Sequence, residues 1–148
     1  MHSQLNMTEK GIELIARLHC PEHKVSTTLS FLVDTGSDKS FLSWEDAARA
    51  GVEVESLPSS SRPVSGFGGA ADARQLKAAC YLHVMFDDKH LETVELKEGM
   101  LVYRPSRKKA GLWQLAPAIS ILGRDFLRES GWILVVNLAK REAYLDKP

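Results

Sequence analysis

The sequence predicts a mainly β fold with one or two short helices, because three kinds of pattern recur along the chain. Several segments alternate apolar and polar residues with a period of two, others are rich in β-branched residues, and turn-forming residues separate them. The 148 residues, 44% hydrophobic and 26% charged, have the composition of an ordinary globular domain. We therefore expect a single domain over residues 1–148, in which the aperiodic residues 1–10 form a flexible N-terminal arm.

The first part of the chain is expected to fold as a hairpin followed by a short helix. Strands are predicted at residues 11–19, 25–33 and 40–42, a helix at 44–50 and an exposed loop at 57–63. The first strand alternates apolar and polar residues, and the second is rich in β-branched ones. Ser43 and Asp46 have the spacing of a helix N-cap and its reciprocal acid, and the loop is rich in proline and serine.

The second part of the chain is expected to add a further hairpin, a helix and closing strands. Strands are predicted at residues 74–86, 90–96, 100–103, 118–122, 132–138 and 142–145, and a helix at 124–129. Residues 87–89 predict the hairpin turn, and Gly131 predicts the end of the helix. Residues 104–114 hold the only basic cluster, which we interpret as a solvated loop, with contact to substrate or nucleic acid as the alternative.

The charge balance excludes a strong general attraction to nucleic acid or membranes. Nineteen basic residues face nineteen acidic ones, and no apolar run approaches the roughly 18 residues that cross a bilayer. Cys20 and Cys80 could in principle pair, but two cysteines do not make a disulfide framework, and no signal segment opens the chain. We expect a reduced, cytoplasmic location.

Asp34-Thr35-Gly36-Ser37 is the first stretch that indicates chemistry. Asp34 follows a predicted buried strand, and Gly36 lets the backbone turn so that neighbouring N–H groups point at the carboxylate. The bland interpretation of Asp34 is a turn residue. An apolar strand ending in Ile121-Leu122-Gly123 follows later in the chain.

A glycine-rich stretch lies between these two motifs. Gly66, Gly68 and Gly69 surround Phe67, which predicts a flexible hairpin tip carrying one large apolar contact.

The two motifs and the glycine-rich stretch between them resemble the retropepsin-like aspartic proteases, the single-domain, retroviral-type members of that class. The resemblance implies a closed β-barrel half-fold with a flap hairpin, in which the Ile121-Leu122-Gly123 strand threads through a ψ-shaped loop. It implies that Asp34 is catalytic, that Thr35 reaches across a dimer axis, that Gly36 gives an N–H to the carboxylate and that Ser37 donates its hydroxyl to Asp34.

The same resemblance implies roles for residues outside the Asp-Thr-Gly motif. Gly66, Phe67, Gly68 and Gly69 would form the flap and bind substrate. Arg124 would pair with Asp38. This pair would attach the loop of the Asp34-Thr35-Gly36-Ser37 motif, here called the motif loop, to the helix predicted at 124–129.

The chemistry of this class dictates assembly, because it needs two carboxylates that share one proton and hold one water. The sequence contains one Asp-Thr-Gly and no second copy. We therefore expect a two-fold homodimer in which each subunit supplies Asp34, with residues 132–145 and the N-terminal arm as candidates for the dimer sheet. The substrate should be a peptide or unfolded protein bound in extended form, and no cofactor or metal is expected.

Three alternatives remain open from the sequence. The same fold could serve as a catalytically weak or silent dimerisation or peptide-binding module. The cluster from His19 to His23 could hold a metal, although an exposed turn fits it better because no second ligand pair matches. Ser37 as a nucleophile lacks spaced His and Asp partners.

Overall fold

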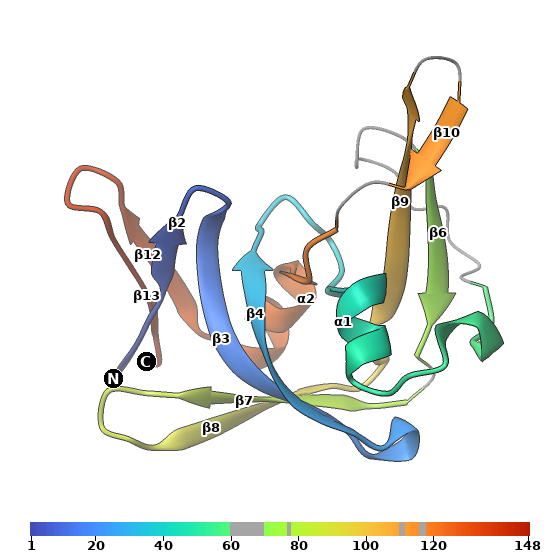
Figure 1. Ribbon diagram of the computed structural model, residues 1–148. Helices are drawn as coiled ribbons and strands as arrows, with labels where there is room; N and C mark the ends of the chain where they lie inside the picture. Colours follow the sequence, from blue (N-terminus) through green and yellow to red (C-terminus); the bar gives the residue numbers. More distant parts are fainter. Residues whose placement is uncertain (60–69, 77, 110–111, 116–117) are drawn as a thin grey trace.

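The computed structural model describes residues 1–59, 70–76, 78–109, 112–115 and 118–148. Within these residues the molecule is mainly β with short helices, as predicted (Figure 1). The strands are β1 (His2–Gln4), β2 (Asn6–Thr8), β3 (Gly11–Cys20), β4 (Val25–Val33), β5 (Phe41–Ser43), β6 (Ala70–Gln75), β7 (Cys80–Met85), β8 (Leu91–Leu96), β9 (Leu101–Lys109), β10 (Leu112–Leu115), β11 (Ile121–Leu122), β12 (Ile133–Asn137) and β13 (Glu142–Asp146). The helices are α1 (Trp44–Arg49) and α2 (Arg124–Ser130), with 3-10 turns η1 (Pro21–His23) and η2 (Val54–Ser56).

The hairpin of β3 and β4 lies within the larger sheet and leads to Asp34. Leu14 pairs with Phe31 in its antiparallel register, and every second residue of β3 from Leu14 to Cys20 is buried. This alternation confirms the predicted strand with one face inward. The predicted cap of α1 is also present, because Ser43 Oγ accepts a hydrogen bond of 3.1 Å from the N–H of Asp46.

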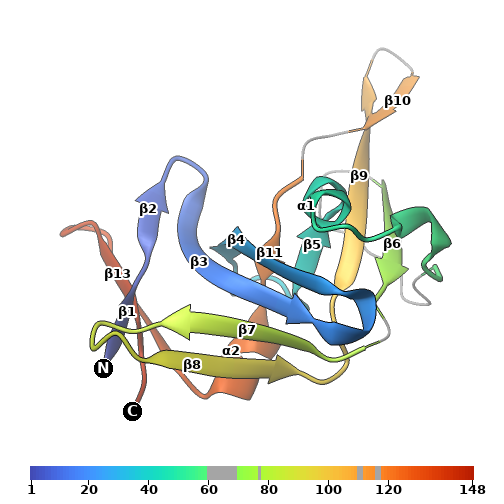
Figure 2. The same ribbon diagram turned by 60° about the horizontal axis from the view of Figure 1, so that its bottom comes forward.

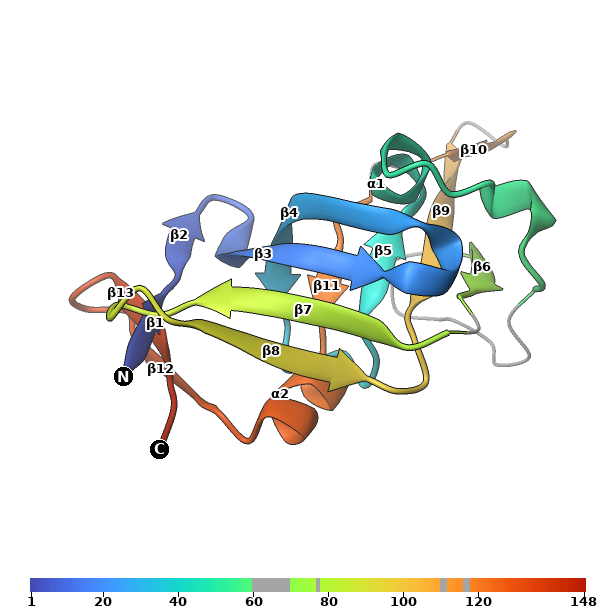
Figure 3. The same ribbon diagram turned by 90° about the horizontal axis from the view of Figure 1, so that it is seen from below.

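The larger sheet follows the order β10-β9-β5-β11-β4-β3-β7-β8, with β2 beside β3 and β6 beside β9. Figures 2 and 3 show β4, β3, β7 and β8 side by side. The short strand β11 lies between β4, to which it is parallel, and β5, to which it is antiparallel. Among the described residues no pairing joins β10 to β8, so the expected closed barrel is not seen.

The N-terminal residues are not a flexible arm. β1 pairs antiparallel with β13 at the other end of the chain, β2 pairs with β3, and Leu5 between them is buried in the core. Strands of three residues are too short to show a period, and the partner of β1 is distant in sequence. Pairing supplied by the C-terminal strand therefore orders a segment that has no local signal.

Two further elements differ from their predictions. Residues 74–86 form the end of β6 and all of β7, because the chain changes partners between them: β6 pairs with β9, whereas β7 pairs with β3 and β8. The basic segment 104–114 is not a loop, since its described part continues β9 and returns as β10. Pairing with β6 at Arg104 and with β10 at residues 107–109 overrides the low β propensity of the charged residues in β9.

Aromatic packing fixes the second helix and the smaller sheet. The ring of Trp132 lies 5.8 Å from that of Phe126 in α2 and 4.9 Å from that of Phe86, both in edge-on geometry. From this anchor the chain enters the sheet of order β1-β13-β12. None of the helices in the described part of the chain is long and apolar enough to span a membrane.

Candidate active site

Asp34 lies directly after β4, at the point where the chain leaves the sheet. Its N–H donates to the carbonyl of Leu122 at 2.9 Å, and the N–H of Leu32 donates to the carbonyl of Ser120 at 2.8 Å. These bonds extend the parallel pairing of β4 with β11 as far as Asp34. The two sequence motifs are therefore neighbours in space, and the second motif positions the backbone of the first.

Asp34 is half-buried, and its carboxylate accepts a hydrogen bond from its own turn. The N–H of Gly36 donates to Asp34 Oδ1 at 2.8 Å, as the sequence led us to expect, and the N–H of Ser37 donates to the Asp34 carbonyl at 3.2 Å. Asp34 Oδ2 has no hydrogen-bond partner among the residues that the structure describes. Oδ1 is thus oriented by a hydrogen bond, and Oδ2 is available to bind another molecule or side chain.

Ser37 does not make the contact that the resemblance implied. Its hydroxyl donates to the carbonyl of Lys39 at 2.7 Å and not to Asp34. The turn after Gly36 brings the Lys39 carbonyl within hydrogen-bond distance of this hydroxyl. Ser37 therefore stabilises the shape of the loop, and Thr35 beside it is exposed.

Gly123 lies where the loop after Asp34 passes closest to β11. A Cβ atom on Gly123 would lie 2.5 Å from the Lys39 carbonyl oxygen and 2.7 Å from that of Ser37. The N–H of the next residue, Arg124, donates to the Ser37 carbonyl at 2.8 Å. The approach requires glycine because backbone atoms occupy the space of any side chain.

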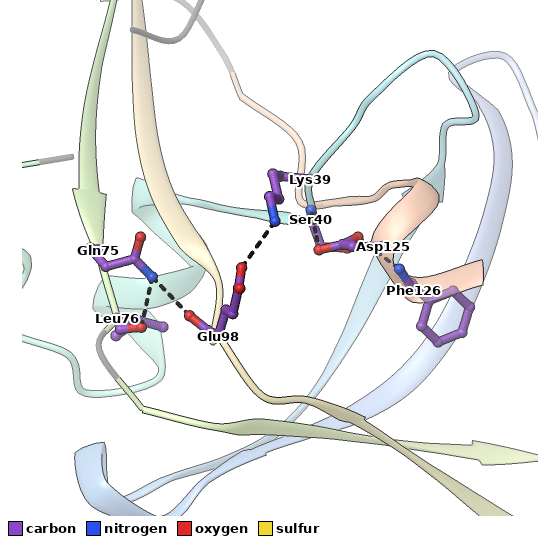
Figure 4. A network of polar contacts seen from close by, with 7 residues as sticks. All are labelled: Lys39, Ser40, Gln75, Leu76, Glu98, Asp125 and Phe126. Carbon is purple, nitrogen blue, oxygen red and sulfur yellow. Dashed lines mark hydrogen bonds and ion pairs between the residues drawn. The ribbon is translucent and has the colours of Figure 1, made fainter. Parts of the chain in front are cut away.

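Asp125, which was not predicted as a site residue, joins the same loop to α2. Asp125 accepts hydrogen bonds from the Ser40 N–H at 3.0 Å, the Ser40 hydroxyl at 2.6 Å and the Phe126 N–H at 2.7 Å (Figure 4). Ser40 Oγ also accepts from the Gly123 N–H at 3.0 Å. Both ends of the loop from Asp34 to Ser40 are thereby attached to the β11–α2 junction.

The comparisons with known proteins agree with this arrangement. A family model described as aspartyl protease matches residues 24–126, which is more than half of the chain. The chain belongs to the aspartyl protease family. The matched range begins just before β4 and ends within α2, so it contains the contacts of Asp34 and of the loop from Asp34 to Ser40 described above.

This aspartyl protease family member has the retropepsin-like fold of a solved structure. It is similar to a retropepsin-like aspartic protease from Rickettsia conorii, with 19% identity, a TM-score of 0.55 and coverage of 98% of this chain and 89% of that one. It is also similar to EIAV protease complexed with the inhibitor HBY-793, with 21% identity, a TM-score of 0.47 and coverage of 84% and 91%. No curated protein sequence matches the chain. The resemblance to retropepsin-like aspartic proteases is therefore confirmed.

In this family member Arg124 contacts the motif loop in two ways. Its Nη1 donates to the Thr35 carbonyl at 2.8 Å, and its Nη2 lies 3.7 Å from Asp38 Oδ1. The side chains of Arg124 and Asp38 are 48% and 62% exposed, so solvent screens the charge pair. The hydrogen bond to Thr35 is the shorter contact and attaches the guanidinium directly beside Asp34.

The segment that enters β11 is held from the other side by Tyr103. The Tyr103 hydroxyl donates to the Ile119 carbonyl at 2.6 Å and accepts from the Ile119 N–H at 3.1 Å. Burial raises the pKa of the Tyr103 phenol, which keeps it neutral and able to donate. Ser120 adds a second attachment, since its hydroxyl donates to Asp46 Oδ2 in α1 at 2.6 Å.

A cavity of about 380 Å³ lies behind the motif loop and does not include Asp34. Polar bridges cross it: Lys39 Nζ lies 3.1 Å from Glu98 Oε2, and Gln75 Nε2 donates to the carbonyls of Leu76 and Glu98, both at 3.0 Å (Figure 4). These bridges connect the motif loop to β6 and to the turn before β9. They support the loop from its Lys39 end, and Asp34 does not line the cavity.

The predicted flap, Gly66, Phe67, Gly68 and Gly69, lies outside the described residues. The strand that would follow it, β6, is described and pairs with β9. Across the described ranges, which include His19 to His23, no group of three or more His, Cys, Asp or Glu side chains could hold a metal ion.

Proposed function

We propose that the protein is an aspartic endopeptidase that works as a homodimer, with one Asp34 from each subunit in a shared active site. The observation that carries the proposal is the state of the single Asp34. It stands at the end of a buried strand, with the Gly36 N–H on Oδ1, while its Oδ2 has no partner among the described residues. One such carboxylate supplies half of the groups that hydrolysis of a peptide bond by this class requires.

In the proposed reaction the two Asp34 carboxylates share one proton, because two like charges a few ångströms apart are not both ionised. The ionised member takes a proton from the attacking water, and the protonated member gives its proton to the peptide carbonyl oxygen. When the tetrahedral intermediate collapses, the C–N bond breaks, the amine takes the proton that the first Asp34 received from water, and a hydroxyl of the intermediate returns its proton to the second Asp34. The Gly36 N–H keeps each carboxylate oriented throughout.

The proposed substrate is an extended stretch of peptide or unfolded protein. It would lie along the active site as an added strand, with Phe67 and the glycines around it closing over it from the flap.

The decisive experiment compares Asp34→Asn with the unchanged protein on an unfolded protein substrate at acidic to mildly acidic pH. We expect Asp34→Asn to lower turnover by at least about 10³-fold, because an amide cannot exchange the proton. Circular dichroism should show the fold retained. Asp88→Asn is the matched control, since Asp88 is an exposed carboxylate in the β7–β8 turn and should keep full turnover.

A statine-type transition-state mimic should block the reaction with one inhibitor bound per two chains. Turnover that survives in Asp34→Asn would rule out the mechanism. Peptide binding by the unchanged protein without any turnover would favour the binding-module alternative.

A further inference from the structure

Cys20 and Cys80 form a buried pair that peptide hydrolysis does not use. Their Sγ atoms lie 2.6 Å apart, both thiols are free, and both residues are 0% exposed. The pair lies in the main core, among the apolar residues that surround β3 and β7. It is separate from the motif loop and the carboxylate of Asp34.

The strand register explains why the two sulfur atoms meet. Cys20 is the last residue of β3 and Cys80 the first residue of β7. Leu18 pairs with Leu82 and His19 with Tyr81 in the antiparallel ladder, so the next step of the register sets Cys20 opposite Cys80. Residues opposite one another in such a ladder have Cα atoms about 4.5–5.5 Å apart, which lies within the range of about 4.4–6.8 Å that disulfides span.

We propose that Cys20 and Cys80 are a redox-modification site, at which a small disulfide oxidant converts the two thiols into an intrachain disulfide. One cysteine thiolate attacks the oxidant disulfide, a mixed disulfide forms and the first thiol of the oxidant leaves. The second cysteine, as its thiolate, attacks the protein sulfur of that mixed disulfide and releases the second thiol. The two cysteines lose two electrons in total, and the oxidant is reduced to two thiols that take up the two protons.

Access to the pair comes from opening of the strand ends. The hydrogen bond with Cys80, followed by burial, raises the pKa of Cys20, so the closed structure keeps this thiol protonated and unreactive. Both cysteines are terminal residues of their strands, and η1, which follows Cys20, has no buried residues. Local opening at this end of the ladder exposes the sulfurs without global unfolding. Oxidation is therefore slow in the folded protein, and the buried disulfide resists reductants afterwards.

The cross-link would close a loop that contains β4, Asp34 and α1. Closing a loop of this size restricts the unfolded chain and stabilises the folded one. The inference is independent of catalysis, because it concerns the connection of β3 to β7 and not the carboxylate.

The test uses the full chain, incubated either with glutathione disulfide or with a reductant. Each sample is then denatured and treated with an alkylating reagent, and its intact mass is measured. We expect the reduced protein to take up two alkyl groups and the oxidised protein none, with a loss of two hydrogen atoms. The unfolding midpoint of the oxidised protein should be higher by about 5–10 °C.

Peptide mapping and a matched variant make the test decisive. Digestion of the oxidised protein without reductant should yield a fragment joining the peptides of Cys20 and Cys80. In Cys80→Ala the oxidant should leave the unfolding midpoint unchanged. If this variant does not fold, the oxidised and reduced samples of the unchanged protein still decide the question. Two free thiols after incubation a few degrees below the unfolding midpoint would overturn the proposal. So would a lasting glutathione adduct, a cross-link between chains or an unchanged midpoint.

Discussion

Asp125 and Asp38 are both acids beside the motif loop, yet their surroundings differ. Asp125 accepts three hydrogen bonds, two of them from Ser40, whereas Asp38 makes one long and exposed contact with Arg124. Hydrogen bonds to a charged and partly buried carboxylate contribute more than an exposed ion pair. At the scale of single residues, Asp125 therefore contributes more than Asp38 to holding the loop that carries Asp34.

This difference predicts unequal effects of removing the two carboxylates. Asp125→Ala should lower the free energy of unfolding by about 2–3 kcal/mol, because the Ser40 hydroxyl and two N–H groups lose their acceptor. Asp38→Ala should change it by no more than about 0.5 kcal/mol. Denaturant titration of the two variants measures both values, and equal losses would contradict the role given to Asp125.

At the scale of elements, the junction of β11 and α2 decides the geometry of the site. β11 is only two residues long, but it pairs with β4 on one side and β5 on the other. Gly123 ends the strand at a point where carbonyl oxygens of the motif loop leave no room for a side chain. The position of Asp34 therefore depends on a glycine that is distant from it in sequence.

Gly123 and Gly131, which lie on either side of α2, should respond differently to substitution. Gly123 has a φ of −97°, which any residue adopts, but its Cβ would meet backbone atoms at 2.5 Å; Gly131 has a φ of 69° and open space around it. Gly123→Ala should therefore lower the free energy of unfolding by about 3 kcal/mol or more, and Gly131→Ala by only about 1–2 kcal/mol. Thermal unfolding and peptidase turnover check this order, and a milder effect at Gly123 would contradict the steric argument.

The elements that the sequence predicted correctly are those with local signals. β3 and β4 show period and β-branching, α1 has its Ser43 cap, and the pairing of β11 beside Asp34 followed from the resemblance. Two contacts without a local signal were missed. β1 is ordered by β13, which is distant in sequence, and the hydroxyl of Ser37 donates to the Lys39 carbonyl because of the path of the loop.

Asp125 could have been suggested by its position in the first turn of a predicted helix, where carboxylates bind free N–H groups. Its partner Ser40 could not, because the contact exists only once β11 lies between β4 and β5. The site was therefore predictable as a set of residues, but not as a set of contacts.

At the scale of the whole molecule, the proposed dimer needs a surface close to Asp34. Figure 1 shows the loop after β4 and the turn between β12 and β13 at the same end of the molecule. β12 and this turn expose three large apolar side chains, Ile133 at 51%, Val136 at 39% and Leu138 at 72%. β12 is also an outer strand of its sheet, with a partner only on the β13 side among the described strands. Apolar side chains and free backbone groups on one edge suit association with a second copy.

Charges placed on this edge should separate the proposed dimer and reduce activity together. The double variant Val136→Glu/Leu138→Glu should weaken self-association by at least about tenfold, because it buries charge in an apolar contact. Leu91→Glu is the control, since Leu91 is a 54% exposed apolar residue on β8, which belongs to the larger sheet and not to the sheet that contains β12. Light scattering and turnover measured over a range of protein concentrations test both consequences.

The double variant should lose turnover at low concentration and regain it at high concentration, whereas Leu91→Glu should follow the unchanged protein. A monomer that hydrolyses peptide at a rate per chain independent of protein concentration would contradict the proposal, because the proposed chemistry needs two Asp34 carboxylates that share one proton.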